Sequence, residues 1–209
     1  MSFERLGMSL GEAIATQRSI RRFRPDPVPM EDLRLCLEAA VRAPNGANRQ
    51  LARFLVITDR ATLQAFGALY REAWWAKRRD ELGWRGPEDV PPGEHHYRAP
   101  MALADHMVDV PCLVLAFAGQ GGPANTVIPA CQNFMLAARA LGLGTVPTTL
   151  HPSVMGRVQA LLGLPPEAGL HFCIPVGYPA EGQRFGGSRR RPSHETTYLD
   201  RWGTPVPWT

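Results

Sequence analysis

The hydrophobic positions along the chain recur at helical spacing in several segments. The predicted helices cover about residues 10–19, 30–41, 61–82, 101–106, 124–141 and 153–162. Ser9 and Glu12 have the spacing of a capping box at the start of the first segment, and Asp59 can cap the third. The stretch 124–141 is nearly uncharged and apolar on more than one face, which predicts a helix at the centre of a domain or in a subunit interface.

Short apolar runs between the helices predict the strands of one sheet. They cover residues 53–58, 110–117, 144–146 and 170–176. The order, helices first and then strands separated by helices, predicts an α+β sandwich with a central sheet and helices on both faces. The length of 209 residues favours a single domain over the whole chain.

Two segments lack a clear period. Residues 83–100 contain four prolines and three glycines, which predicts a loop or lid. From about residue 180 the chain is polar, basic and rich in glycine, and it contains Trp202 and Trp208. Such a tail is rarely stable alone, so we expect it to pack on another subunit.

Composition excludes several classes of protein. Hydrophobic residues make up 44% of the chain and charged residues 20%, which is ordinary for a globular protein and excludes general disorder. No uninterrupted apolar run is long enough to span a membrane, and the charged N-terminal residues do not resemble a signal peptide. We therefore expect a cytoplasmic protein with no membrane partner.

The excess charge of +4 comes from two basic clusters near the ends of the chain. One lies within residues 18–24 and the other within 184–191. Two compact clusters suit one small anion better than a long polyanion, so no nucleic-acid partner is expected, and a basic nucleic-acid-binding module remains only a weak alternative.

Motifs for classical nucleophiles and metals do not appear. GxSxG, HExxH and P-loop patterns are absent, and His95 and His96 are adjacent rather than at helical ligand spacing. The four cysteines are far apart in apolar segments, which favours buried free thiols over disulfides or a zinc site.

Five segments in this order resemble the nitroreductase family of FMN-dependent oxidoreductases. They are QRSIRRF (17–23), APNGANRQ (43–50), ALGLGTVPTTLH (140–151), PVGYP (175–179) and RRRP (189–192). The resemblance extends from about residue 10 to 203. It implies a nitroreductase-like three-layer sandwich whose central sheet is mixed but mainly antiparallel. It also implies an intertwined homodimer with the site at its interface, a lid at about 70–100 and a dimer-wrapping tail at about 180–209.

The resemblance assigns FMN contacts to the first motif. Arg18 and Ser19 would hold phosphate or ribityl oxygens, and Arg21 would lie against the pyrimidine edge of the flavin. Guanidinium groups suit both tasks because they present several donors in a planar fork. The alternative is that these arginines form a solvated helix end favoured by the helix dipole, an interpretation that also covers Arg22 and Arg24.

In the resembled family the second motif reaches the flavin of the partner subunit. Its contacts would come from Pro44, Asn45, Gly46 and Asn48. The alternative is an ordinary turn after a helix, with Gly46 at positive φ.

The remaining motifs complete the implied cofactor site. Pro147, Thr148 and Thr149 would line the flavin edge, with a backbone amide of Thr149 or Leu150 near N5. His151 is a candidate acid, although with Pro152 it suits the start of the next helix better. Arg189, Arg190 and Arg191 resemble a phosphate clamp, of which two would make contact.

The resemblance implies ping-pong transfer of hydride from NAD(P)H through FMN to an electron-poor nitroaromatic, quinone or enone. The flavin performs the chemistry, so no catalytic side chain and no metal are expected. The small-molecule acceptor would be covered by aromatic lid residues, with His95 and His96 nearby: Trp74, Trp75, Trp84 and Tyr97. Trp74 and Trp75 could instead simply pack their helix on the core.

Other functions remain open within this resemblance. A flavin-dependent deiodinase would use a Glu, Tyr and Lys lid; Glu72 and Lys77 are present, but no Glu and Tyr have the expected spacing. A flavin destructase has no positive signature here. A non-enzymatic flavin-binding or storage protein would have the same cofactor contacts.

Overall fold

The computed structural model describes residues 3–119 and 122–209. Its four strands form one sheet in the order β1-β2-β4-β3, with antiparallel neighbours. The strands are β1 (Ala52–Ile57), β2 (Cys112–Ala118), β3 (Gly144–Thr145) and β4 (Gly169–Gly177). An isolated parallel bridge joins Ser19 to Thr145, which makes the edge of the sheet mixed. The predicted α+β class and mainly antiparallel sheet are confirmed.

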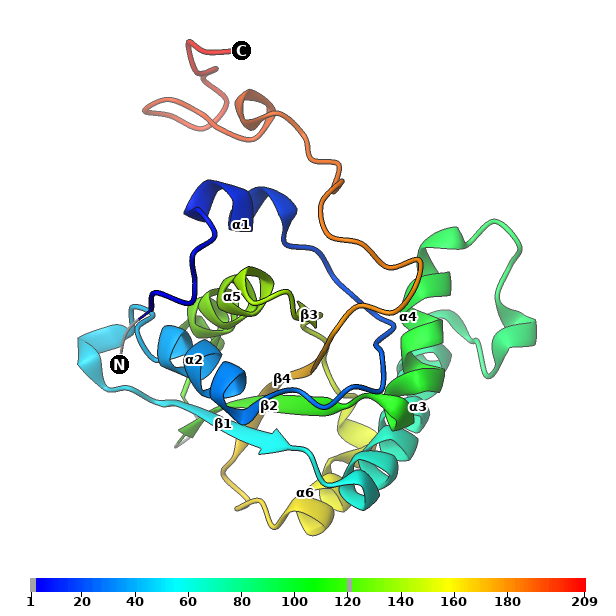
Figure 1. Ribbon diagram of the computed structural model, residues 1–209. Coiled ribbons are helices and arrows are strands. Elements are labelled where there is room, and N and C mark those ends of the chain that lie inside the picture. The colour runs from blue at the N-terminus through cyan, green and yellow to red at the C-terminus, as the bar shows by residue number, and fades with distance from the viewer. Residues whose placement is uncertain (1–2, 120–121) are drawn as a thin grey trace.

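Helices cover both faces of the sheet (Figure 1). The six α-helices are α1 (Leu10–Thr16), α2 (Met30–Ala40), α3 (Arg60–Leu82), α4 (His95–His106), α5 (Ala124–Ala140) and α6 (Met155–Leu162). Helices α2 and α5 pack on one face, where Phe134 and Val127 meet Val114 of β2. Helices α3, α4 and α6 pack on the other, where Phe66 contributes to a second cluster that contains Leu115.

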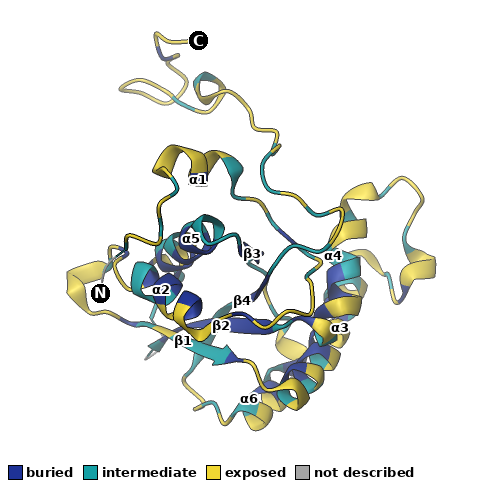
Figure 2. Ribbon diagram, in the orientation of Figure 1, coloured by how far each residue is buried: buried dark blue, intermediate teal, exposed yellow. Residues whose placement is uncertain are grey.

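Strand β2 is at the centre of this three-layer sandwich. All of its residues are buried, as the dark blue ribbon of Figure 2 shows. Val114 and Ala116 belong to one hydrophobic cluster and Leu113 and Leu115 to the other, because successive side chains of a strand point to opposite faces. A strand that is buried on both faces needs a continuous apolar sequence, and β2 has one instead of alternating polar and apolar residues.

Both predicted helix caps are present. The Ser9 hydroxyl accepts a hydrogen bond from the Glu12 amide (3.1 Å), and the Asp59 carboxylate accepts one from the Thr62 amide (2.8 Å). Each cap satisfies one of the amides that an α-helix leaves free at its start. Helix α3 ends at Gly83, whose φ of 77° is the left-handed conformation common after a helix.

The predicted end of the first helix is wrong. Helix α1 ends at Thr16 rather than Ser19, and Gln17 already has extended geometry. The amide of Ile20 donates to the Thr145 carbonyl (3.0 Å), and the Ile20 side chain is only 1% exposed. Burial of Ile20 against the sheet edge thus draws residues 17–20 out of the helix, so Arg18 and Ser19 do not form a solvated helix end.

The prediction of a loop over residues 83–100 is wrong in its second half. Helix α4 begins at His95 and includes Pro100, although proline removes one helical hydrogen bond. The helix nevertheless forms because Leu103 and Ala104 are buried in the cluster with α3. The loop between α3 and α4 therefore covers only residues 83–94, including the 3-10 turn Pro87–Asp89.

The four cysteines are free and buried, as predicted. Burial raises the pKa of the Cys36, Cys112 and Cys131 thiols to about 12 and raises that of Cys173 as well. Thiols of this kind remain protonated and are poor nucleophiles. No group of three or more metal-ligating side chains occurs in residues 3–119 and 122–209, and no helix within these ranges is long and apolar enough to cross a membrane.

Candidate functional site

Segments from both ends of the chain form a cleft beside the sheet. Residues 17–24 run next to the chain that leaves β4, and in Figure 1 the blue and orange segments lie together there. Phe23 bridges Pro179, and the Ala180 amide donates to the Arg22 carbonyl (3.0 Å). A cavity of about 630 Å³ opens along this contact, a size within the usual range for ligand sites.

A glycine lets the first segment approach the sheet. A Cβ atom at Gly144 would lie 2.6 Å from the Cβ atom of Ile20, closer than packed side chains allow. Gly144 therefore permits the strand-like contact that presents Arg18, Ser19 and Arg21 along one edge. The first motif is brought together as predicted, although its geometry is extended rather than helical.

The cavity is strongly cationic. Its lining includes Arg18, Arg21, Arg22 and Arg184, and no carboxylate lines it in the described part of the chain. Arg21 is half-buried, and burial lowers the pKa of its guanidinium, which still remains charged at neutral pH. Arg18, Arg22 and Arg184 are exposed, so the arginines form a solvent-accessible cluster without a carboxylate among the described residues of the lining, and such a cluster favours an anionic ligand.

Hydrogen bonds to the C-terminal segment hold the arginines of residues 18–21 in place. The Arg21 amide donates to the side-chain oxygen of Gln183 (3.3 Å), and the Arg18 guanidinium donates to the Gly186 carbonyl (3.1 Å). These contacts link positions more than 160 residues apart in the sequence. Arg184 belongs to the basic cluster noted in the sequence, whereas Gln183 was missed, since no local pattern indicates this proximity.

A second cavity of about 250 Å³ also reaches Arg21. It lies between α3 and the chain after β3, where Pro147, Thr148 and Thr149 line it as a group. The hydroxyl groups of Tyr70 and Thr148 are 2.6 Å apart, and burial raises the pKa of Tyr70 to about 12, so that phenol stays neutral.

The hydrogen bonds of the Thr148 backbone indicate whether the amide of Thr149 or that of Leu150 is free to bind a ligand. Thr148 donates to the Cys173 carbonyl (3.0 Å) and accepts from the Cys173 amide (2.7 Å). Because successive amides of an extended chain point to opposite sides, the amide of Thr149 points away from β4. Of the two amides considered from the sequence, Thr149 is therefore the one that faces away from the sheet.

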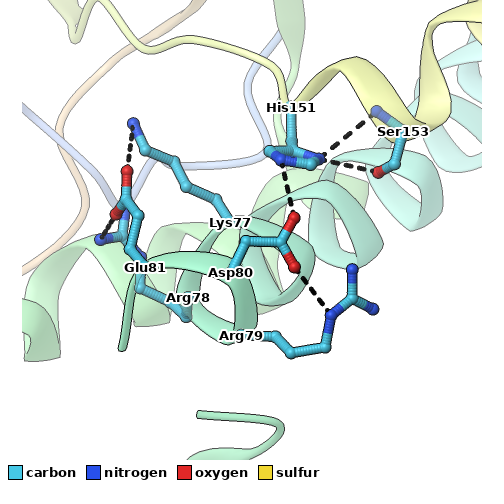
Figure 3. A network of polar contacts seen from close by, with 7 residues as sticks. All are labelled: Lys77, Arg78, Arg79, Asp80, Glu81, His151 and Ser153. Atoms are coloured by element: carbon cyan, nitrogen blue, oxygen red, sulfur yellow. Dashed lines mark hydrogen bonds and ion pairs between the residues drawn. The ribbon is translucent and has the colours of Figure 1, made fainter. Parts of the chain in front are cut away.

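His151 has a clear structural role. Its Nδ1 atom accepts a hydrogen bond from the Ser153 amide (3.3 Å), and its ring lies before the 3-10 turn Pro152–Val154. Figure 3 shows the other ring nitrogen facing Asp80 of α3, with Nε2 and Oδ2 3.4 Å apart. These contacts match the helix-start interpretation.

The aromatic residues of the expected lid form two layers. Trp74 is 7% exposed, packs edge-on against Trp75 and also lines the second cavity. Farther out, the rings of Trp84 and Tyr97 meet edge to face at 5.0 Å. The Arg78 guanidinium lies between the layers, 5.1 Å from the Trp74 ring and 5.0 Å from the Tyr97 ring. Trp74 thus both packs α3 on the core and lines the cavity, so it fits both alternatives considered from the sequence.

Sequence reasoning named Trp74 and Lys77 of α3 but assigned no role to Tyr70 or Arg78. Tyr70, Trp74, Lys77 and Arg78 all line the second cavity. Their spacing of four, three and one residues places them on one side of a helix. That pattern is visible in the sequence and could have identified Tyr70 and Arg78.

The loop at residues 43–50 lies at the other end of the strands. Ala52, which follows it, pairs with Ala118 at one end of β2, whereas Cys112 at the other end leads toward Thr145 through β4. A strand of seven residues is about 20 Å long. Within one chain, Pro44, Asn45, Gly46 and Asn48 are therefore not brought to the cationic cleft.

The loop has a strained backbone at unexpected positions. Ala47, Asn48 and Gln50 have φ values of 50°, 53° and 51°, whereas Gly46 does not have the positive φ considered from the sequence. The Asn45 side chain accepts from the Gln50 amide (2.8 Å), and Arg53 donates to the Gln50 carbonyl. The loop is thus shaped by these side chains rather than by a glycine.

Arg189, Arg190 and Arg191 also lie apart from the two cavities. They are exposed on the extended tail, which Figure 1 shows leaving the body of the molecule. Beyond them Trp202 is 91% exposed and packs on Tyr198, and Trp208 donates to the Ser193 hydroxyl (3.3 Å). The expected phosphate clamp is therefore not assembled from these residues within one chain.

The fold and the cleft define an α+β sandwich with a cationic edge built from both ends of the chain. The family model described as the nitroreductase family matches residues 14–178. The chain belongs to the nitroreductase family.

Relatives within the family have different names. An NADH dehydrogenase of Thermus thermophilus is 35% identical, over 81% of this chain and 86% of its own. An iodotyrosine deiodinase of Thermotoga neapolitana is 30% identical, over 78% of this chain and 84% of its own. A solved iodotyrosine deiodinase bound to FMN and 3-iodo-L-tyrosine superposes with a TM-score of 0.72 and 25% identity, covering 94% of this chain and all of that one.

Proposed function

We propose that the protein is an FMN-dependent oxidoreductase that takes hydride from NAD(P)H and reduces an electron-poor nitroaromatic, quinone or enone. The cationic cleft that contains Arg21 carries this proposal, together with membership of the nitroreductase family. A quinone acceptor would gain the hydride and one proton and become a hydroquinone. Bound FMN would supply the two-electron chemistry, passing hydride between the reductant and the acceptor.

The residues of the two cavities fit this cofactor. The first cavity offers several guanidinium groups and, among the described residues, no carboxylate in its lining, which suits a phosphate dianion. Arg21 lies where the two cavities meet and would face the pyrimidine edge. The Thr149 amide points away from the sheet and would donate to the flavin N5 atom.

The protein's own contribution is binding and orientation. The neutral Tyr70 hydroxyl holds the Thr148 hydroxyl, and Trp74 closes the same cavity with an apolar surface. Such a wall excludes water from one side of the ring and strengthens electrostatic contacts there. No side chain has to act as nucleophile, in keeping with the protonated, buried cysteines.

We further propose a homodimer in which the loop at 43–50 and the tail from about residue 180 complete the site of the partner. The separation of these segments from their own cleft supports the exchange, as do the exposed apolar side chains of the tail and α1. They include Leu10, Ile14, Leu199, Trp202 and Trp208.

Sedimentation of the wild type and of Trp202→Ser tests the homodimer. The wild type is expected to have twice the chain mass of 23.0 kDa at micromolar concentration, and the variant is expected to dissociate more readily. A monomeric wild type that binds FMN tightly would contradict the shared site.

Iodotyrosine deiodination is the second candidate function, because two of the relatives named above are deiodinases. The charge of the second cavity argues against it. Arg21, Lys77 and Arg78 line this cavity, and no carboxylate lines it in the described part of the chain to hold the ammonium group of an amino acid. A zwitterion would thus lack a partner for its positive end.

Two anaerobic half-reactions test the proposed function. The purified protein is expected to show oxidised flavin absorbance that NADPH or NADH bleaches, and nitrofurazone or menadione is expected to restore it. A yellow protein that fails either step would instead be a flavin-binding protein. Release of iodide from 3-iodotyrosine by the reduced protein, without reduction of the other acceptors, would favour the deiodinase.

A further inference from the structure

The second cavity carries more positive charge than a flavin ring needs. Three permanent cations from two segments line it: Arg21 from the extended N-terminal segment, and Lys77 and Arg78 from α3. Tyr70 and Trp74 give it flat aromatic walls. A site with aromatic walls and several cations favours a planar ligand that carries negative charge.

One nearby carboxylate, that of Glu81, neutralises only part of this positive charge. Glu81 lies outside the lining, with its Oε2 atom 3.0 Å from Arg78 Nη1 and its Oε1 atom 3.9 Å from Lys77 Nζ, so one carboxylate faces two cations. Asp80 is directed to His151 and Arg79, as Figure 3 shows. Tyr70 adds no negative charge, because its phenol stays protonated.

Arg78 has an unsatisfied donor at this place. Its side chain is 13% exposed, and the Nε atom is buried with no hydrogen-bond partner among the described residues. The Arg78 guanidinium packs against the rings of Trp74 and Tyr97, and these two contacts fix its plane. Buried polar atoms without partners are rare in native proteins, and this one is next to a cavity.

We propose that this cavity receives the acidic group of the electron acceptor, so that the preferred acceptors are small aromatic carboxylates rather than neutral compounds. Lys77 and Arg78 hold the carboxylate, and the aromatic walls hold the ring. This inference rests on the proposed function.

The test compares 4-nitrobenzoate with 4-nitrobenzamide, which have similar shape but different charge. Their dissociation constants for the oxidised holoprotein are measured by calorimetry, and their kcat/KM values by consumption of NADPH. The wild type is expected to prefer the anion by both measures. Lys77→Gln is expected to lower that preference about 10-fold, which corresponds to about 1.4 kcal/mol.

Arg79→Gln is the matched control. Arg79 is next to Arg78 in sequence, but its side chain is 54% exposed, extends to Asp80 and does not line the cavity. Its loss is expected to leave the preference for the anion as in the wild type. Lys77→Arg keeps the charge and is expected to retain most of the preference, which separates a charge effect from a general loss of structure.

The outcomes separate this proposal from the proposed function. Equal affinity of the wild type for the two compounds, or an unchanged preference in Lys77→Gln, would overturn the anionic-acceptor proposal. A Lys77→Gln variant that loses only its rate with NADPH would also count against it, since the lysine would then serve the reductant. Preferential binding of 4-nitrobenzoate without any turnover would support the anion site while the proposed reductase function fails.

Discussion

Arg21→Met is expected to weaken FMN binding about 10- to 100-fold. Methionine keeps much of the apolar stem but removes the guanidinium that lies between the two cavities. A hydrogen bond to a charged partner contributes about 1.5–3 kcal/mol, and every 1.4 kcal/mol is about a factor of ten in affinity. Quenching of FMN fluorescence on titration with apoprotein measures the change.

Arg24→Met provides the control for this substitution. Arg24 is three residues farther along the same segment, pairs with Asp26 (2.9 Å) and lines neither cavity. It is expected to bind FMN with the affinity of the wild type. If Arg24→Met weakened binding as much as Arg21→Met did, a diffuse positive field would explain the affinity, and the assigned position of Arg21 would be wrong.

Gly67→Ala is expected to destabilise the protein by about 2 kcal/mol, although alanine favours helices. A Cβ atom at Gly67 would lie 2.5 Å from the Val108 amide nitrogen and 2.6 Å from its Cα atom, and these backbone atoms cannot rotate away. Overpacking of this kind costs about 3 kcal/mol, and the gain in helix propensity returns only about 1 kcal/mol.

Thermal unfolding measures the balance of these two effects. At about 2–4 °C per kcal/mol for a chain of this size, the midpoint is expected to fall by about 4–8 °C. Gly11→Ala in α1 is the matched control, because no atom lies within 4 Å of its added Cβ, and it is expected to leave stability equal or higher. A stabilised Gly67→Ala would show that α3 can move away from the 3-10 turn Met107–Asp109.

Local sequence signals predicted most of the elements but not where two of them end. The caps at Ser9 and Asp59 were visible because each depends on residues three positions apart. The end of α1 was not visible, since it depends on burial of Ile20 against a strand that lies 125 residues later. The start of α4 at His95 was missed for the same kind of reason, because the prolines and glycines of residues 83–100 conceal a helix that forms through the later burial of Leu103.

The candidate site was predictable where a motif is continuous and not where the fold assembles it. Residues 18–21 and 147–149 were identified from local motifs, and each group lines one of the two cavities, which share Arg21. Gln183 contacts Arg21 across 162 positions of sequence, and no local pattern indicates that contact. Lys77 and Arg78 were visible as helical neighbours of Trp74, but their charge alone did not indicate that they would line a cavity.

The shape of the loop at residues 43–50 bears on the proposed homodimer. Its left-handed residues Ala47, Asn48 and Gln50 are held by hydrogen bonds within the loop and to Arg53, so its shape exists before any partner arrives. A rigid loop loses little conformational entropy on association, whereas a flexible one loses about 1–2 kcal/mol for each residue that becomes ordered. In the proposed homodimer the strain would already be present in the separate chain, and more of the contact energy would remain to hold the partner.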